Sequence, residues 1–362
     1  MRHSLINKKR NPMTDLLSLT YDELGAFVTE SLGEKSYRTK QIFSFLHKGV
    51  GIAEMTTLSK PLRERMSALA FAHFPKVEMK QVSRDGTVKY LFSLRDGSCV
   101  ESVLMKYKHG NSLCISSQVG CNMGCVFCAS TVGGKARDLT PAELVGQVIS
   151  AQLDSGERVS NIVMMGIGEP LDNFDNVKKF LNIVSDPNGI CIGQRHISLS
   201  TCGLCPRIRE LADLGLGITL SVSLHASTDE DRSAIMPINR KYNLDALMDA
   251  CAYYYGKTHR RISFEYTLIS GKNDSREQAQ SLVRLLNNTL RRKTDMPIHV
   301  NLIRLNEARE GLSAPDMARV NNFCAILEKN GIGATVRRKL GSDINAACGE
   351  LRAVKNKVAA EG

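Results

Sequence analysis

The sequence contains no run of about eighteen apolar residues, which is the length that a membrane-spanning helix needs. Its start, MRHSLINKKRNPMTDLLSL, has basic residues but neither the apolar core nor the small-residue cleavage site of a signal peptide. These absences argue against membrane insertion and against secretion. We therefore expect a cytoplasmic protein without a membrane partner.

The cysteines do not form the pattern of a disulfide scaffold. The chain has 362 residues and 11 cysteines, an odd number that is spread through its length. Small secreted scaffolds have short chains in which an even number of cysteines is closely spaced. In a reducing compartment, clustered cysteines more often ligate metals or take part in redox chemistry. With 43% apolar and 23% charged residues, the chain can bury a sizeable core.

The net charge of +11 is unevenly distributed. Residues 1–110 carry 18 Lys and Arg against 11 Asp and Glu, and residues 291–362 carry 13 against 8. The middle, residues 111–290, is nearly neutral, with 17 against 18. Basic ends around a neutral body indicate extensions that hold a polyanion, with Arg337, Arg338 and Lys339 among the phosphate contacts. The alternative is a set of solvated surface charges.

The chain divides into four segments by its periodicity. Residues 1–75 read as a helical domain, in which Thr20 and Glu23 form a capping box. Residues 76–110 read as a meander of three strands with turns at the two Asp-Gly pairs, 85–86 and 96–97. Residues 111–340 alternate strands with amphipathic helices. Residues 341–362 form a polar C-terminal segment.

The alternating segment predicts a parallel sheet curled into a partial barrel of six or so strand–helix units. We therefore expect an α/β fold whose active site lies at the carboxyl ends of the strands. The expected strands span residues 112–117, 161–166, 196–201, 218–225, 262–269 and 299–305, and a seventh spans 334–339.

Three cysteines lie in one glycine-studded stretch, SSQVGCNMGCVFCAST. The spacing Cys-x3-Cys-x2-Cys lets Cys121, Cys125 and Cys128 bind three corners of a [4Fe-4S] cluster and leave the fourth iron open. A structural zinc site would need a fourth ligand, for which Cys202, Cys205 and His196 are candidates. An electron-transfer cluster would likewise need a fourth cysteine.

The cysteine spacing, with Phe127 before the last cysteine, resembles that of the radical S-adenosylmethionine superfamily. The resemblance implies that S-adenosylmethionine binds the open iron through its amino and carboxylate groups. One strand–helix unit later, GIGEP places Gly168 and Glu169 where that superfamily binds the aminoacyl part of the cofactor.

The resemblance extends from about residue 20 to residue 352. The segments CISSQVGCNMGCVFCAS, VMMGIGEPLDN, SLSTCG, SVSLHAS, VNLIRLN and GSDINAACGEL are together similar to the dual-specificity adenine-C2 methyltransferases of 23S ribosomal RNA and transfer RNA. This family implies a radical S-adenosylmethionine barrel with an RNA-binding N-terminal domain.

The resemblance implies three catalytic residues. Cys348 matches the cysteine that accepts a methyl group and then joins to carbon 2 of adenine. Cys114 matches the cysteine that resolves this protein–RNA adduct through a transient disulfide, and Glu101 matches the carboxylate that removes the adenine proton. From the residues alone, we would interpret all three as structural. The family also implies an external low-potential electron donor, a thiol reductant for the Cys114–Cys348 disulfide, and a monomer.

The implied cofactor contacts lie at strand ends. Besides Gly168 and Glu169, they are Ser200, Ser223, Leu224, His225 and Asn306. Taken alone, His225 reads as a core histidine or a ligand of a second metal. The six remaining cysteines match nothing functional, and we interpret the pair Cys202 and Cys205 as structural.

Two other functions stay open. A related enzyme methylates carbon 8 of the same ribosomal adenosine and confers antibiotic resistance; it shares the cluster and both mechanistic cysteines. The proline after Gly-Glu in GEPLDN favours carbon 2. The second alternative is an iron–sulfur protein that binds RNA or transfers electrons without radical chemistry, which would have no use for Glu169 or Cys348.

Overall fold

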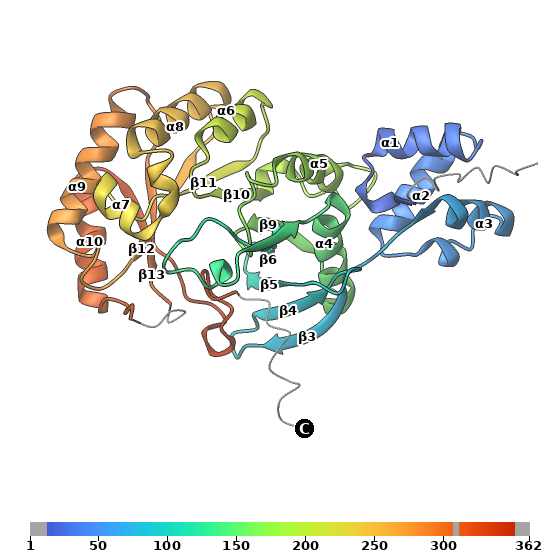
Figure 1. The fold of residues 1–362 in the computed structure, drawn as a ribbon, viewed down its shortest axis with the longest axis horizontal. Coiled ribbons are helices and arrows are strands. Elements are labelled where there is room, and N and C mark those ends of the chain that lie inside the picture. The colour runs from blue at the N-terminus through green and yellow to red at the C-terminus, as the bar shows by residue number, and fades with distance from the viewer. Residues whose placement is uncertain (1–12, 307–310, 352–362) are drawn as a thin grey trace, which may run out of the picture.

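The computed structural model describes residues 13–306 and 311–351. Its centre is a curved ten-stranded sheet with the strand order β14-β13-β12-β11-β10-β9-β6-β5-β4-β3 (Figure 1). Seven consecutive strands of this sheet run parallel: β6 (Gly110–Cys114), β9 (Val159–Met164), β10 (Ile197–Thr201), β11 (Thr219–Ser223), β12 (Ile262–Leu268), β13 (His299–Arg304) and β14 (Gly333–Val336). The predicted α/β class with a partial barrel is confirmed.

Helices connect the parallel strands along the outer side of the curved sheet (Figure 1). They are α4 (Pro141–Ser155), α5 (Phe174–Ser185), α6 (Cys205–Asp213), α8 (Leu244–Thr258), α9 (Arg276–Leu286) and α10 (Met317–Lys329). The short helix α7 (Asp229–Ile235) lies instead against the cysteine loop, where the Ile235 carbonyl accepts from the Val126 amide at 3.0 Å. Helix α4 begins as predicted: the Thr140 hydroxyl accepts from the Glu143 amide at 3.3 Å, and the Glu143 carboxylate accepts from the Thr140 amide at 2.9 Å. This capping box fixes where the helix leaves the cysteine loop.

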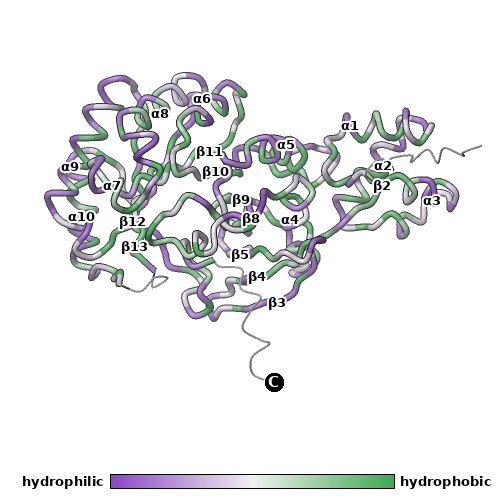
Figure 2. Tube along the Cα trace, viewed as in Figure 1, coloured by the Kyte–Doolittle hydropathy of each residue, from purple (hydrophilic) through white to green (hydrophobic). Residues whose placement is uncertain are grey.

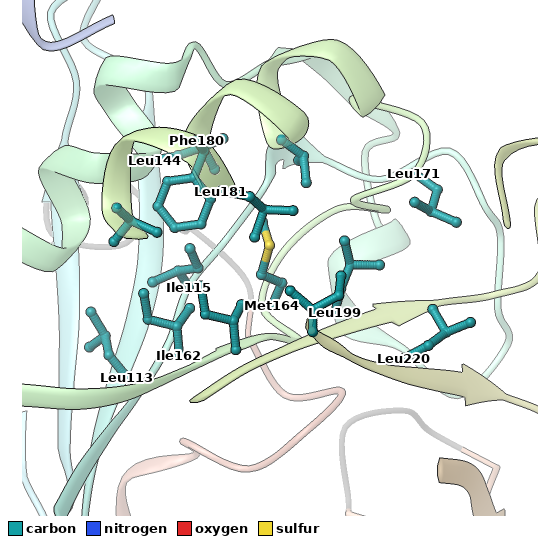
Figure 3. Packing of buried hydrophobic residues seen from close by; sticks show 14 of the residues in the cluster. Leu113, Ile115, Leu144, Ile162, Met164, Leu171, Phe180, Leu181, Leu199 and Leu220 are labelled. Atoms are coloured by element: carbon teal, nitrogen blue, oxygen red, sulfur yellow. The ribbon is translucent and has the colours of Figure 1, made fainter. Parts of the chain in front are cut away.

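The core lies between the sheet and these helices. Apolar residues of β6, β9, β10 and β11 meet apolar residues of α4 and α5 (Figure 3). Because side chains alternate along each strand, these residues face the helices while the intervening residues face the inside of the barrel. Hydrophilic residues lie on the outer helices α9 and α10 (Figure 2).

The N-terminal helices pack at one side of the barrel (Figure 1). They are α1 (Tyr21–Ala26), α2 (Tyr37–His47) and α3 (Lys60–Leu69), and the predicted capping box of Thr20 and Glu23 starts α1. Strand β1 (Thr14–Asp15) pairs in parallel with β2 (Ala70–Phe71). An ion pair of 2.7 Å between Glu23 and Lys179 connects these helices to α5. Residues 1–12 of the expected N-terminal segment lie outside the described residues.

The meander continues the barrel sheet. Strands β3 (Lys76–Val82), β4 (Val88–Ser93) and β5 (Cys99–Tyr107) are antiparallel, and β5 pairs with β6. Gly86 and Gly97 have φ values of 83° and 84°, which explains the glycine in each predicted turn. The inward face of β5 therefore lies next to the first barrel strand.

Segment 341–351 lies between the meander and the cysteine loop. The Gly341 amide donates to Asp85 at 2.9 Å, and the Ser83 hydroxyl donates to Asp343 at 2.5 Å. At its other end, the Gly349 carbonyl accepts from the Ala129 amide at 2.7 Å. These bonds hold the C-terminal segment across the carboxyl ends of the strands. Residues 352–362 of this expected segment lie outside the described residues.

Candidate active site

A cavity of about 920 Å³, open to solvent, lies at the carboxyl ends of the parallel strands. Such ends are the usual place for active sites in barrels of this kind. Ten of the residues singled out in the sequence line it: Cys121, Cys125, Cys128, Gly168, Glu169, Ser200, Ser223, His225, Asn306 and Cys348. These residues come from six separate segments, which the curvature of the sheet brings together.

The loop with the three cysteines is closed at its base by two short strands. Strand β7 (Gln118–Gly120) pairs antiparallel with β8 (Lys135–Asp138). Gly120 has a φ of 77°, and a side chain there would collide with the Gly134 carbonyl, since an added Cβ would lie 1.9 Å from its oxygen. The glycine thus lets the two strands approach closely enough to present the cysteines into the cavity.

The chemistry of the loop fits an iron–sulfur cluster. Burial raises the pKa of Cys121 to about 12, and burial together with the neighbouring Cys128 and Cys121 raises the pKa of Cys125. Such thiols become thiolates only when a metal compensates their charge. Within the described residues, no three His, Cys, Asp or Glu side chains gather closely enough for one metal ion. Three thiols in one loop suit a cluster that takes three protein ligands, whereas a structural zinc ion needs a fourth ligand.

Glu169 is buried at the edge of the cavity. Its two carboxylate oxygens accept one backbone N–H each, from Leu171 at 3.1 Å and from Cys202 at 2.8 Å. Burial raises the pKa of Glu169, although these bonds oppose the shift. The side chains of Thr201 and Cys202 also hydrogen-bond to this carboxylate. Because Glu169 lines the cavity, it is placed to accept from an ammonium group there.

His225 is a neutral donor in the cavity. Its Nδ1 accepts from the Thr267 amide at 2.9 Å, which places the ring proton on Nε2. Burial, with a further contribution from Arg232, lowers the pKa of His225 to about 3, so the ring stays neutral. The residue also has a φ of 59°, unusual for a side chain with a Cβ. The backbone conformation of the turn after β11 thus directs this ring into the cavity.

Two buried oxygens in the cavity have no hydrogen-bond partner among the described residues. One is Oε2 of Glu265, whose other oxygen accepts from Asn301 at 3.0 Å. The other is Oδ1 of Asn306, whose amide nitrogen donates to the Cys348 carbonyl at 3.0 Å. Because unpaired buried acceptors are costly, both oxygens indicate a bound ligand that donates to them.

A second cavity of about 1100 Å³ adjoins the first. Cys348, Asn306 and Arg337 line both cavities, and Cys114 lines the second. Burial and the nearby Cys348 together raise the pKa of Cys114 to about 12. The structure thus brings Cys114, from the first strand of the barrel segment, and Cys348, from the C-terminal segment, to one cavity.

Glu101 lies beside this second cavity. It is on β5, on the same side of the strand as Val103, which lines the cavity and pairs with Cys114. Its carboxylate forms an ion pair of 3.5 Å with Lys89, and Lys89 also donates to the Asn345 carbonyl at 3.2 Å. Glu101 is therefore linked to the segment that carries Cys348.

Comparisons with known proteins agree with this geometry. Two protein-family models match the chain. The model of the Radical SAM superfamily matches residues 115–283, and the model of the ribosomal RNA large subunit methyltransferase N-terminal domain matches residues 14–72. A Clostridium novyi (strain NT) protein named probable dual-specificity RNA methyltransferase RlmN is 48% identical over 344 residues, which cover 94% of this chain and 98% of the relative. The chain belongs to the RlmN family.

Two further similarities extend over almost the whole chain. The relative of the same name from Alkaliphilus oremlandii (strain OhILAs) is 50% identical over 341 residues, which cover 93% of this chain and 97% of the relative. The crystal structure of a radical SAM methyltransferase from Sphaerobacter thermophilus is 40% identical, with a TM-score of 0.88, and the match covers 94% of this chain and 100% of that one. This RlmN-family chain thus shares both its sequence and its overall fold with these proteins.

In this RlmN-family chain, the positions of three further residues bear on the sequence expectations. Leu224 is buried in the core and does not line the cavity; its carbonyl accepts from the buried Arg232 at 3.1 Å. Cys202, which we interpret as structural from the sequence, lines the first cavity, and its amide donates to Glu169 at 2.8 Å. Arg337 follows the end of β14 and lines both cavities, and its exposed neighbours Arg338 and Lys339 line the second cavity.

Proposed function

We propose that this protein is a radical S-adenosylmethionine methyltransferase that methylates carbon 2 of adenosine in 23S ribosomal RNA and in transfer RNA. The observation that carries the proposal is the junction of two cavities at Cys348. One cavity holds the three thiols of the cysteine loop, and the other holds Cys114. The names of the relatives support RNA as the substrate, and the matching N-terminal family model is named for large-subunit ribosomal RNA. Transfer RNA is what the family resemblance implies.

The residues around the first cavity fit a [4Fe-4S] cluster and S-adenosylmethionine. Cys121, Cys125 and Cys128 would hold the cluster, and Glu169 would accept from the amino group of the cofactor. When bound, these groups supply the methyl group and a radical that removes hydrogen from it. The other predicted contacts are Gly168, Ser200, the 223–225 turn and Asn306.

Gly168 has a φ of 104°, and a Cβ there would lie 2.6 Å from that of Gln118. Only glycine allows this close approach.

Three residues of this chain would act on the RNA. The Cys348 sulfur accepts the methyl group and carries its carbon to carbon 2 of adenine. Glu101 takes the proton from that position, and the ion pair with Lys89 holds its carboxylate beside the cavity. Once the adduct has given up this proton and returned one electron, the Cys114 thiolate would attack the Cys348 sulfur: the sulfur–sulfur bond forms, the carbon–sulfur bond breaks, and the released carbon takes a proton to become the methyl group. A thiol reductant restores the two cysteines.

These roles require an electron donor and a segment that binds the RNA. Reduction of the cluster needs an external low-potential electron donor, and the basic N-terminal segment would bind the RNA. We propose that the enzyme acts as a monomer in the cytoplasm, where its RNA substrates are found. No helix among the described residues is long and apolar enough to cross a membrane.

The test is methylation of transfer RNA and of a 23S ribosomal RNA fragment by the reconstituted protein, followed by mass spectrometry of the nucleosides. We expect 2-methyladenosine from the wild type and none from Cys348→Ala. Formation of 8-methyladenosine instead would show the carbon-8 alternative. Absence of any methylated adenosine, with a loaded cluster and intact RNA, would contradict the proposal.

A further inference from the structure

A third cavity lies at the opposite end of the barrel, where the parallel strands begin. It contains about 1120 Å³ of space open to solvent. Its lining comes from the residues just before or at the start of β9, β10, β11 and β12. The cavity is separated from the proposed active site by the length of the sheet, which is about 20 Å for strands of five to seven residues.

The lining of this cavity is basic. Arg158, Arg195, Arg260 and His196 contribute to it, and no aspartate or glutamate does. Within residues 13–306 and 311–351, none of the three arginines forms an ion pair. Residues 111–290 are nearly neutral overall, whereas the lining of this cavity has three arginines and no acidic side chain.

The arginines are also poorly satisfied by hydrogen bonds. Nε of Arg260 is buried and has no partner in the described part of the chain. Arg195 donates from Nε to the His196 ring at 3.2 Å, which leaves its remaining donors for a ligand. Guanidinium groups with free donors bind phosphate oxygens well, because their planar fork matches the oxygen pair.

The cavity borders the N-terminal helices. Gly189 lies directly against α2, since a Cβ there would lie 1.8 Å from Nδ1 of His47. Two residues later, Cys191 lines the cavity with a φ of 58°. A single RNA molecule can therefore contact both the N-terminal helices and this end of the barrel.

We propose that this basic cavity binds phosphate groups of the RNA backbone, away from the target adenosine. The inference rests on the proposed function, because it takes RNA as the substrate. A folded RNA with stems of about ten base pairs is longer than the roughly 20 Å between the two ends of the sheet. Contacts here carry no sequence information and orient the RNA on the enzyme.

The test compares two double variants that remove the same charge. Arg158→Gln/Arg195→Gln changes the cavity, and Arg276→Gln/Arg284→Gln removes two exposed arginines from the outer helix α9. Binding of full-length transfer RNA is measured from 50 to 300 mM salt. We expect the cavity variant to lose on the order of tenfold in affinity at 100 mM salt and to lower the slope of log affinity against log salt by one to two. The α9 variant should match the wild type within about twofold.

Arginines near the carboxyl ends of helices can also stabilise those helices, and Arg158 and Arg260 follow α4 and α8 closely. If that were their role, the cavity variant would unfold at lower urea concentration and bind RNA with an unchanged salt slope, and the proposal would be overturned. A second experiment measures whether inorganic phosphate at 10 mM stabilises each protein against urea. Stabilisation of the wild type but not of the cavity variant by phosphate, with unchanged RNA binding, would assign the site to a small anion instead.

These outcomes are separate from the proposed function. A wild type that binds and methylates RNA, together with a cavity variant that binds RNA equally well, overturns only the cavity proposal. A wild type that binds no RNA overturns both.

Discussion

The Gln118 side chain joins the cysteine loop to the turn that carries Glu169. Its Oε1 accepts from the Glu169 amide at 2.9 Å, and its Nε2 donates to Asp138 and to Asp172, both at 2.8 Å. Lys135 completes the network with a bond of 2.7 Å to Asp172. Gln118 is fully buried, so none of these bonds is replaced by water if the amide is removed. The position of Glu169 relative to the three cysteines depends on this amide.

We expect Gln118→Leu to weaken S-adenosylmethionine binding on the order of tenfold, which is the loss of about 1.4 kcal/mol. Iron content should stay near that of the wild type, because the three cysteines remain. Equilibrium binding to anaerobically reconstituted protein measures the first quantity, and iron analysis measures the second.

Gln152→Leu is the matched control for this variant. Gln152 also accepts a backbone N–H, that of Val159 at 3.0 Å, but it lies at the other end of the sheet. Cofactor binding should be unchanged in the control. Equal weakening in both variants would show a general loss of stability rather than a positioning role for Gln118.

The cluster assignment predicts about four irons per chain and a broad brown absorbance for anaerobically prepared protein. Cys125→Ala should lose this absorbance, because two cysteines hold a cubane cluster poorly. Cys324→Ala, which changes a half-buried cysteine of α10, should keep it. A triple alanine variant at positions 121, 125 and 128 that retained its full iron content would refute the assignment.

The roles of Cys114 and Cys348 predict opposite behaviour of their variants. Cys114→Ala should accumulate a covalent protein–RNA adduct in cells, because no thiolate remains next to the linking sulfur. Cys114→Ala/Cys348→Ala should form no adduct, and Glu101→Ala should also trap one, because proton loss precedes resolution. A denaturing gel with and without RNase measures the adduct. Absence of an RNA-shifted band for Cys114→Ala, under conditions in which the wild type methylates RNA, would be incompatible with these roles.

Stability should fall in mild acid because of His47. Burial lowers the pKa of its ring to about 4, against 6.5 for an ordinary histidine. Between these values the unfolded chain binds a proton that the folded chain does not, so the free energy of unfolding decreases as the pH falls. The contribution is about 2 kcal/mol between pH 7.5 and pH 5.

His47→Leu should remove that part of the pH dependence, because leucine fills similar space and does not titrate. Urea unfolding at several pH values between 5 and 7.5 measures the slope for both proteins. His196→Leu, which changes an exposed histidine, is the control and should keep the wild-type slope. An unchanged slope in His47→Leu would mean that other groups cause the acid sensitivity.

The sequence by itself determined the local elements and the residue types that the cysteine loop brings to the first cavity. Capping boxes at Thr20 and Thr140 and glycines in the Asp-Gly turns act within a few residues, so their structures follow from local rules. The three cysteines also lie in one short loop, and their spacing alone limits what they can bind. The order of strands and helices then predicted that this loop would lie at the carboxyl edge of a parallel sheet.

The tertiary structure alone decided which distant residues meet. From the sequence we predict that Arg337 contacts RNA phosphates, and the structure shows that β14 ends just before it and that it lines both cavities with Cys348. Gln118 reads as an ordinary polar residue, and only the packing of β7 against the turn at Glu169 reveals its bonds. Likewise, Arg158, Arg195 and Arg260 are far apart in a nearly neutral part of the sequence. They line one cavity because the sheet places the starts of its strands side by side. These contacts depend on sheet curvature and on the packing of segments remote in sequence, which local patterns do not encode.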